Sequence, residues 1–343
     1  MRYLILSILC LTLALFGCQK TDPEGVNQTI YVDHDYAKMP VYIRGNVASG
    51  KLILLIHGGP GGSGLEYRDG TYTEMLEEEF AVAYWDQRGQ GMSQGTFHTD
   101  FFTIDQMVED MKAVILSLRA KYGDNLKLYV LGHSWGGTLG TAFMIKKDYQ
   151  HLCSGWIESN GAHDIPKLNV EAIKMFRQVA AEEIAEGRSV DEWTEIKEWA
   201  DGIDTLAISL ETGGDINQKG FEVEQILGED GVIGGDEIIF PDLYSPTNYL
   251  TSFLTGNVTS SMLLDEVEMA AYTDSLDQIT IPSLFLWGKY DFVVPPALGF
   301  DAFNRVSSAD KEIVIYNRSG HSPMANEGEA YASDIIEFVN RVD

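Results

Sequence analysis

Cysteine is scarce in this chain of 343 residues. It occurs three times: Cys10 lies in an apolar N-terminal run, Cys18 follows just after that run, and the third is Cys153. Only Cys153 is left in the predicted mature body, which excludes an intrachain disulfide in any redox compartment. We expect Cys153 to be a small buried apolar residue and not a reactive thiol.

Basic side chains are also few. Lys and Arg number 24 against 52 Asp and Glu, so the formal net charge is −28. Phosphate contacts need clustered basic side chains, so we exclude a nucleic-acid partner. The seven histidines lack the spacing of metal ligands, and the sequence has no H-E-x-x-H motif. We therefore expect neither a bound metal nor a cofactor.

The N-terminus carries an apolar run from Leu4 to Phe16, which follows Arg2. This run has the length of a signal peptide and is short for a membrane span. It ends at Leu15-Phe16-Gly17-Cys18, which resembles a bacterial lipobox. We predict a lipoprotein signal peptide over 1–17, lipidation at Cys18 and a tether over 18–27. The protein would then be lipid-anchored in a bacterial cell envelope, facing the periplasm or the surface; simple secretion and an uncleaved anchor are the alternatives.

A G-x-S-x-G motif, Gly132-His133-Ser134-Trp135-Gly136, directly follows the apolar run 126–131. A strand before this motif and a helix after it are typical of a sharp turn that exposes the serine hydroxyl. We interpret Ser134 as a nucleophile. The alternative is a glycine-rich turn without a catalytic role.

A glycine-rich loop, His57 to Gly64, follows the apolar strand predicted at 51–56. A strand that is apolar throughout is typical of a parallel sheet covered on both faces. Such a loop exposes backbone N–H groups at the sheet edge where ligands bind. It lacks the Gly-Lys-Ser/Thr ending of a phosphate-binding loop. We predict that the N–H groups of Gly59 and Trp135 form an oxyanion hole.

The strand predicted at 80–85 ends at Asp86-Gln87-Arg88-Gly89-Gln90-Gly91. We interpret Asp86 and Arg88 as a structural pair that braces neighbouring loops. A helix is predicted over 103–122, with Thr103 and Gln106 forming a capping box.

Two late strands supply the partners that a serine nucleophile needs. The strand at 283–287 is followed by Asp291, and the strand at 312–316 is followed by His321. A serine hydroxyl needs a base to take its proton, and the base needs a third group to hold its tautomer. The order Ser134, Asp291, His321 is that of the α/β-hydrolases. We predict His321 as the base and Asp291 as the acid, because the rival aspartates at 277 and 301 do not follow apolar strands.

The segment 161–275 interrupts the alternation of strands and helices. It holds 24 acidic and six basic side chains, a net charge of −18. We predict a helix over 170–186, a second helix capped by Ser189, and loops or a hairpin at the glycine-rich stretches 213–220 and 228–235. The acidic charge suits either a solvated helical surface or a negative lid over the site.

Three motifs together resemble the proline iminopeptidases of the α/β-hydrolase fold: His57-Gly58-Gly59-Pro60-Gly61-Gly62, the Asp86 to Gly91 stretch, and Gly132 to Gly137. The resemblance implies a mostly parallel sheet with helices on both faces. It places a mainly helical cap, 161–275, between the sixth and seventh strands of a core formed by 28–160 and 276–343.

Family enzymes release an N-terminal residue, usually proline, from peptides, and glutamates in the cap hold the substrate amine. Trp193 and Trp199 with Glu195 and Glu198 only loosely match the family's tryptophan-tryptophan-glutamate stretch, so the amine-binding residues are left unassigned. The resemblance implies a serine peptidase that forms an acyl-enzyme on a small peptide. A hydrolase of a small ester, amide or lactone is the alternative, and a non-catalytic binding protein on the same scaffold is the third reading. The oligomeric state is left open.

Overall fold

A mostly parallel sheet forms the centre of the molecule in the computed structural model. The structure describes residues 25–68, 70–234 and 249–342; in the last range it describes side chains from residue 255 onward. The predicted signal peptide, Cys18 and the tether as far as residue 24 lie outside the described residues. Strand order is β1-β2-β4-β3-β6-β7-β8-β9, with β5 paired to β2. The strands are β1 (Val26–His34), β2 (Ala37–Gly45), β3 (Lys51–Ile56), β4 (Ala81–Trp85), β5 (Gln94–Gly95), β6 (Lys127–His133), β7 (Gly155–Ser159), β8 (Ser283–Gly288) and β9 (Lys311–Tyr316).

The pairs from β4 through β9 are parallel, whereas the β1–β2 hairpin adds to β4 in antiparallel fashion. The helices are α2 (Thr71–Glu79), α3 (Ile104–Tyr122), α4 (Trp135–Ile145), α5 (Ile165–Glu186), α6 (Val190–Asp201), α7 (Leu210–Glu229), α8 (Tyr249–Glu268), α9 (Pro296–Arg305), α10 (Pro323–Asn326) and α11 (Gly328–Arg341). Within the described ranges, no helix combines the length and the apolar character that crossing a bilayer requires.

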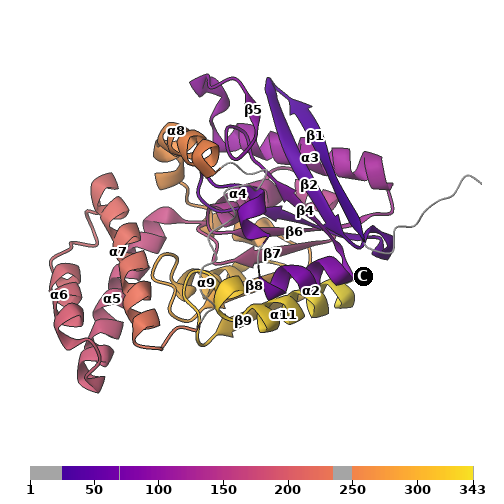
Figure 1. Cartoon of the computed structure of the whole chain (residues 1–343). Coiled ribbons are helices and arrows are strands. Elements are labelled where there is room, and N and C mark those ends of the chain that lie inside the picture. Colours follow the sequence, from indigo (N-terminus) through magenta and orange to yellow (C-terminus); the bar gives the residue numbers. More distant parts are fainter. Residues whose placement is uncertain (1–24, 69, 235–248, 343) are drawn as a thin grey trace, which may run out of the picture.

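Helices cover both faces of the sheet because successive strand residues point to opposite sides. Along β3, Leu52, Leu54 and Ile56 join the core beneath α3, α4 and α9. Ile53 and Leu55 join the core beneath α2 and α11. Figure 1 shows α2 and α11 side by side along one face, with α3 behind the hairpin. This confirms the α/β-hydrolase fold and the doubly covered sheet.

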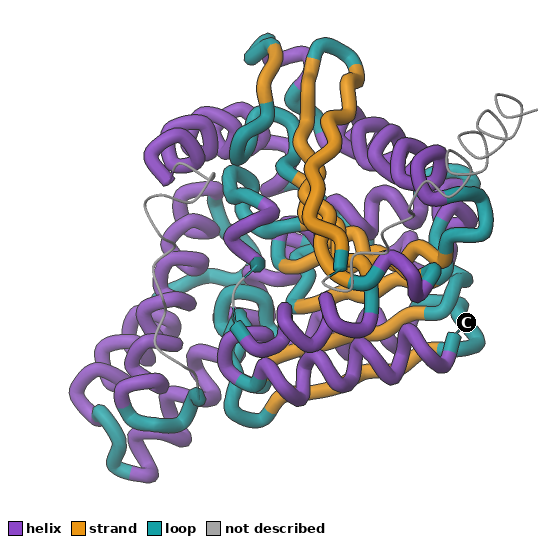
Figure 2. Tube along the Cα trace, turned by 45° about the vertical axis from the view of Figure 1, so that its right-hand side comes forward, coloured by secondary structure: helices purple, strands orange, loops and turns teal. Residues whose placement is uncertain are grey.

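The chain between β7 and β8 forms the helices α5 to α8. Helices α5 to α7 lie together beside the orange strands in Figure 2, whereas Leu263 of α8 packs into the core next to the sheet. If the two-residue β5 is not counted, β7 and β8 are the sixth and seventh strands of the chain, as predicted. Three of these helices, α5 to α7, share a core with Phe292 from the loop after β8. The two ends of the insert meet where Asp164 bridges Ala271. The cap is therefore a continuous insertion that returns to its point of departure.

The glycine-rich stretch 213–220 is helical, so the prediction of loops or a hairpin there was wrong. It lies inside α7, which begins after Ser209, whose side chain accepts the Thr212 N–H. The buried stripe of Ile216, Val223 and Leu227 packs into the cap core and outweighs the low helix propensity of glycine. Most of the second stretch, 228–235, follows the end of α7 and is not helical.

Two capping predictions also need correction. Ser189 has φ +37° and makes no side-chain cap; its hydroxyl donates to Asp230 instead. Thr103 accepts the Gln106 N–H as predicted, but the Gln106 amide turns to Asp35 and Asp110, so the reciprocal half of the box is missing. Both helices nevertheless form, because their apolar faces are buried.

Candidate active site

Ser134 lies at the sharp turn between β6 and α4. Its backbone has φ +56° and ψ −121°, a conformation that a non-glycine residue adopts only where the surroundings hold it. The Ser134 carbonyl accepts the N–H groups of Gly137 and Ala162, and its own N–H donates to Ser159. Gly136 passes so close to the end of β3 that a Cβ there would overlap the Ile56 carbonyl. The turn therefore has the geometry of a nucleophile elbow, with Ser134 only half-buried.

Asp291 and His321 meet at the same edge of the sheet, because they follow the neighbouring parallel strands β8 and β9. The His321 Nδ1 atom lies 3.1 and 3.0 Å from the two carboxylate oxygens of Asp291. Asp291 also accepts the N–H groups of Val293 and Val294, at 3.0 and 2.6 Å, and the amide of Asn160. These bonds fix the carboxylate, and the carboxylate makes Nδ1 the protonated nitrogen. The Nε2 atom of His321 is left as the proton acceptor.

The Asp291–His321 pair is buried, and its electrostatics favour a basic imidazole. Burial alone would lower the pKa of His321, but the charge and hydrogen bond of Asp291, with a further contribution from Glu224, raise its pKa above the ordinary value. No hydrogen bond joins His321 to the Ser134 hydroxyl in the described part of the chain. Such contacts often tighten only when substrate binds.

The loop of His57 to Gly64 lies against the elbow, as the oxyanion-hole prediction requires. A Cβ on Gly58 would lie 3.1 Å from the Cβ of Ser134. The Gly58 N–H is engaged, since it donates to the Tyr67 hydroxyl at 2.8 Å. Gly59 is exposed beside it. Trp135 is the first residue of α4, so its N–H has no acceptor one turn earlier in the helix.

A chain of three hydrogen bonds joins the loop at Gly58 to the backbone of His321. The Gly58 N–H donates to the Tyr67 oxygen, and the Tyr67 hydroxyl lies 2.6 Å from the Nδ1 atom of His133. The Nε2 atom of His133 lies 2.7 Å from the His321 carbonyl. A carbonyl only accepts, so Nε2 carries the proton and Tyr67 donates to Nδ1. Burial lowers the pKa of His133 to about 3, with His321 adding to the effect, so this ring is neutral at physiological pH.

The position of His133 beside Ser134 in the sequence gives no sign that its ring approaches the predicted base. The structure instead places its ring 4.8 Å from the ring of His321, centroid to centroid. Sequence reasoning had no signal for this contact, because the two residues are brought together by the packing of separate strands.

Asp86 and Arg88 both brace loops as predicted, but they do not pair with each other. Asp86 accepts from the Ser63 hydroxyl and from the N–H groups of Gly64 and Met92. Arg88 forms a two-point ion pair with Asp110 of α3, both contacts being 2.7 Å. The two residues therefore fix the loops through different partners.

Gln87 lies between these two residues and bonds directly to the site. It accepts from the indole of Trp135 at 2.9 Å and donates to the His57 carbonyl at 3.1 Å. The Asp86 to Gly91 stretch thus ties the glycine loop to the elbow.

Glu224 of α7 is a site residue that the sequence prediction missed. Its Oε2 atom accepts the His321 N–H at 2.7 Å, and its Oε1 atom accepts the Phe292 N–H at 3.0 Å. The available signal was a helical pattern through 210–229, which would have placed Glu224 one residue from the buried stripe at Val223. Glu195 and Glu198, by contrast, are exposed on α6.

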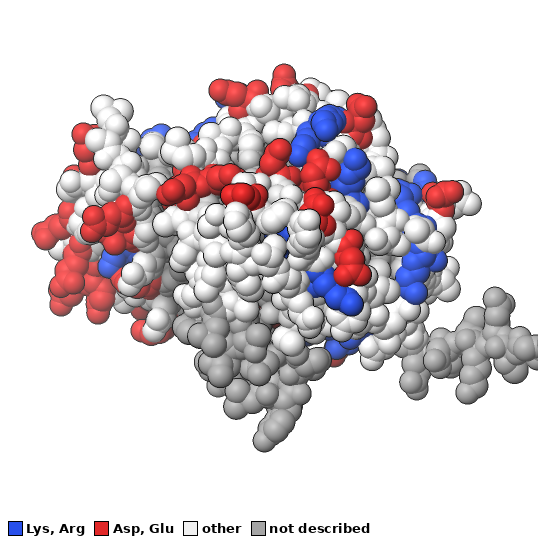
Figure 3. Space-filling model, turned by 90° about the horizontal axis from the view of Figure 1, so that it is seen from above, with Lys and Arg blue, Asp and Glu red and all other residues white. Residues whose placement is uncertain are grey.

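The acidic charge of the cap lies mostly on its outer surface. Figure 3 shows red side chains gathered at the cap end of the molecule, and Asp191, Glu192, Glu195 and Glu198 of α6 are exposed. This favours the solvated surface over a negative lid for α6. Cys153 is buried as predicted, and burial raises the pKa of its thiol to about 12.

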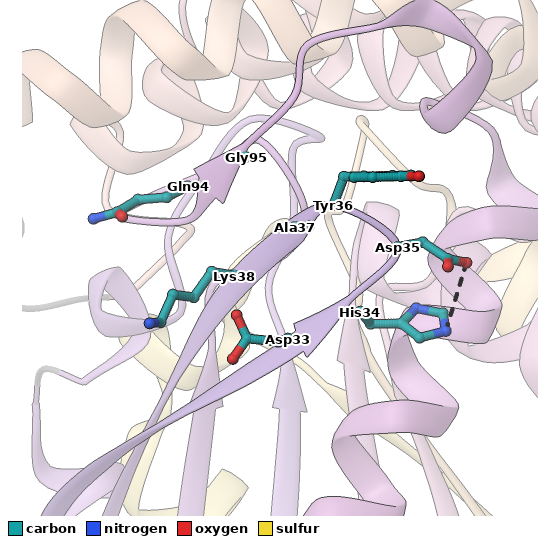
Figure 4. Close-up of a pocket in the computed structure, with 8 residues that line it drawn as sticks. All are labelled: Asp33, His34, Asp35, Tyr36, Ala37, Lys38, Gln94 and Gly95. Carbon is teal, nitrogen blue, oxygen red and sulfur yellow. Dashed lines mark ion pairs between the residues drawn. The ribbon is translucent and has the colours of Figure 1, made fainter.

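Two surface hollows lie away from the triad. One, of about 530 Å³, is lined by the tip of the β1–β2 hairpin and by β5, and Figure 4 shows Asp35 and His34 paired at its rim. The other, of about 540 Å³, lies between α3, α4 and the end of α8, with Met269 at its edge. Neither contains Ser134, Asp291 or His321, so we place the reaction at the strand ends and not in these hollows.

The sheet order, the elbow and the cap between β7 and β8 define an α/β-hydrolase. A family model described as serine aminopeptidase, S33, matches residues 48–197 and 251–329. These ranges span more than half of the chain and include Ser134, Asp291 and His321. The chain therefore belongs to the S33 serine aminopeptidase family of α/β-hydrolases, the group that includes the proline iminopeptidases it resembles.

Relatives of known name are similar over most of their length. The probable aminopeptidase YbaC of Bacillus subtilis is 25% identical over 308 residues, covering 87% of this chain and 92% of that protein. The proline iminopeptidase of Saccharolobus solfataricus is 26% identical over 299 residues, covering 86% of each.

Solved structures of the same fold carry several names. The proline iminopeptidase of Mycobacterium smegmatis has a TM-score of 0.62 at 18% identity, covering 92% of this chain and 98% of that one. An esterase from Exiguobacterium antarcticum has a TM-score of 0.59, also at 18% identity, covering 92% of this chain and 100% of that one. These likenesses establish the fold and do not identify the substrate.

Proposed function

We propose that the protein is a serine hydrolase that removes the N-terminal residue from small peptides through an acyl-enzyme on Ser134. The observation that carries the proposal is the buried Asp291–His321 pair at the sheet edge where the elbow holds Ser134. Aminopeptidase and proline iminopeptidase relatives that align over most of the chain support the peptide substrate.

The mechanism follows from the assigned protons. The Nε2 atom of His321 takes the Ser134 proton while Ser134 attacks the acyl carbon, and Asp291 stabilises the imidazolium that forms. The oxyanion is bound by the N–H groups of Trp135 and Gly59. His321 then returns the proton to the leaving amine, and water attacks the acyl-enzyme with His321 again as base.

A fluorophosphonate probe tests the nucleophile directly. We expect wild-type protein to be labelled at Ser134, as read by peptide mass spectrometry, and Ser134→Ala to stay unlabelled. The matched control is Ser154→Ala, which changes a serine just before β7 and should leave labelling intact. An unlabelled wild type would refute the assignment.

A hydrolase of a small ester, amide or lactone is the second candidate. It is favoured by the exposed positions of Glu195 and Glu198 on α6, since neither side chain forms a hydrogen bond or ion pair with Ser134, Asp291 or His321 among the described residues. A panel of aminoacyl fluorogenic amides, free or blocked at the amine, against short esters separates the two candidates. The aminopeptidase reading requires faster turnover of the free-amine substrates, with the proline derivative included in the panel.

We also propose that Cys18 is lipidated and that residues 18–27 tether the enzyme to the cell envelope. The lipobox-like Leu15 to Cys18 supports this proposal. Cells fed an alkyne fatty acid should yield a labelled wild-type protein and an unlabelled Cys18→Ala variant. Label retained in that variant would contradict the proposal.

A further inference from the structure

We propose that Glu224 is a positioning residue for His321, supplied by the cap to the catalytic edge of the core. The inference deepens the proposed function and rests on it, since it assumes that His321 acts on Ser134. Glu224 would act through His321 and Asp291 and would not itself touch the reacting atoms.

One carboxylate spans the two loops that carry the acid and the base. The Glu224 Oε1 atom accepts the N–H of Phe292, the residue after Asp291, and the Oε2 atom accepts the N–H of His321 itself. The lengths are 3.0 and 2.7 Å. Hydrogen bonds to an ionised carboxylate are stronger than neutral ones. The spacing between Asp291 and His321 is therefore set partly by a residue of the cap.

Two glycines make room for this contact. A Cβ on Gly220 would lie 2.9 Å from the Phe292 carbonyl oxygen, so α7 can pack against this loop only if position 220 has no side chain. Glu224 is one helical turn further on the same face, which directs it to the loop below. A Cβ on Gly320 would overlap the Glu224 carboxylate. Helix and loop are thus shaped for each other around this carboxylate.

The charged groups that face Glu224 are Asp291 from the loop after β8 and His321 from the loop after β9, with the neutral His133 ring behind His321. Burial and the charge of Asp291 raise the pKa of Glu224, whereas the charge of a protonated His321 and the N–H groups of His321 and Phe292 favour the ionised carboxylate. The Glu224 carboxylate in turn raises the pKa of His321. An ionised Glu224 therefore stabilises the imidazolium that forms when His321 takes the Ser134 proton, and its removal lowers the pKa of His321.

The test uses the rate of fluorophosphonate labelling as a function of pH, in the full chain. In Glu224→Gln we expect labelling about tenfold to a hundredfold slower, because a misplaced base is costly, and an acid limb shifted to lower pH. Glu224→Asp keeps the charge but is too short to reach both N–H groups, so it should slow labelling without that shift. Glu222→Gln is the matched control, since this exposed residue of α7 pairs with Lys219.

A purely structural role would reduce the labelled fraction and the melting temperature but would leave the acid limb in place. Gly320→Ala should displace the Glu224 carboxylate and reproduce the pH profile of Glu224→Gln. This second variant tests the proposal if Glu224→Gln folds poorly. Glu224→Gln with the wild-type rate and profile would overturn the proposal. So would a loss confined to KM for free-amine substrates, because Glu224 would then bind substrate. An unlabelled wild type would refute the function of Ser134 itself, a result distinct from both.

Discussion

Tyr67→Phe removes one oxygen atom from the chain of hydrogen bonds between the glycine-rich loop of His57 to Gly64 and His321. That oxygen accepts the Gly58 N–H at 2.8 Å and lies 2.6 Å from the Nδ1 atom of His133. Phenylalanine keeps the ring and its edge-on contact with His133, whose centroid is 5.5 Å away. The substitution therefore isolates the hydroxyl.

The magnitude follows from what the missing oxygen leaves behind. Gly58 and His133 are buried, so the change leaves the Gly58 N–H and the Nδ1 atom of His133 without hydrogen-bond partners and away from water. Each unsatisfied buried group costs about 1–3 kcal/mol. Tyr67 itself is only partly buried, which lets some water reach the gap. We expect the free energy of unfolding to fall by about 2–4 kcal/mol.

Urea unfolding followed by fluorescence measures this loss, and the activity assay measures its effect on the site. The glycine-rich loop loses its link to the elbow, so kcat/KM should fall by about tenfold or more. Tyr31→Phe is the control, because Tyr31 is 57% exposed and its change should stay within about 0.5 kcal/mol. A loss below about 1 kcal/mol for Tyr67→Phe would show that the hydrogen-bond chain does not hold the loop.

Two further predictions concern buried charge. Asp110→Asn leaves the buried Arg88 guanidinium with an uncompensated charge, so the free energy of unfolding in urea should fall by about 3–5 kcal/mol. The control is the exposed Asp105→Asn on the same helix, which should cost less than about 0.5 kcal/mol. Equal losses would contradict the buried ion pair. Burial lowers the pKa of His57 to about 4, below the unfolded value of about 6.5, so the unfolded state binds the extra proton and stability falls as pH drops through this window. His57→Gln should remove about 1.4 kcal/mol per pH unit from that slope, measured by urea titrations at pH 7 and 5, and an unchanged slope would refute it.

The core fold was predictable because its signals are local. Apolar strand runs such as 51–56 alternate their side chains between two covered faces, and the strand ends carry the glycine loop, Ser134, Asp291 and His321. In a parallel sheet these ends meet at one edge, so chain order alone placed the residues together.

The cap was less predictable because its helices depend on docking. Gly213, Gly214 and Gly220 lower the helix propensity of α7, so the sequence alone did not predict a helix there. Burial of the apolar face of α7 compensates for this low propensity. The gain comes from contact with Phe292, a residue from a distant part of the chain. The same limit hid the partner of Arg88, which is Asp110 on a helix and not the neighbouring Asp86.

The sequence by itself determined the fold class, the elbow and the placing of Ser134, Asp291 and His321 at strand ends, because each depends on a short motif after a strand. Only the tertiary structure decided that Glu224 reaches His321, across 97 positions of the chain, and that His133 lies against the same ring. Those contacts are made by side chains from separate elements, and their geometry is set by how the cap and the strand-end loops pack, which no local pattern specifies.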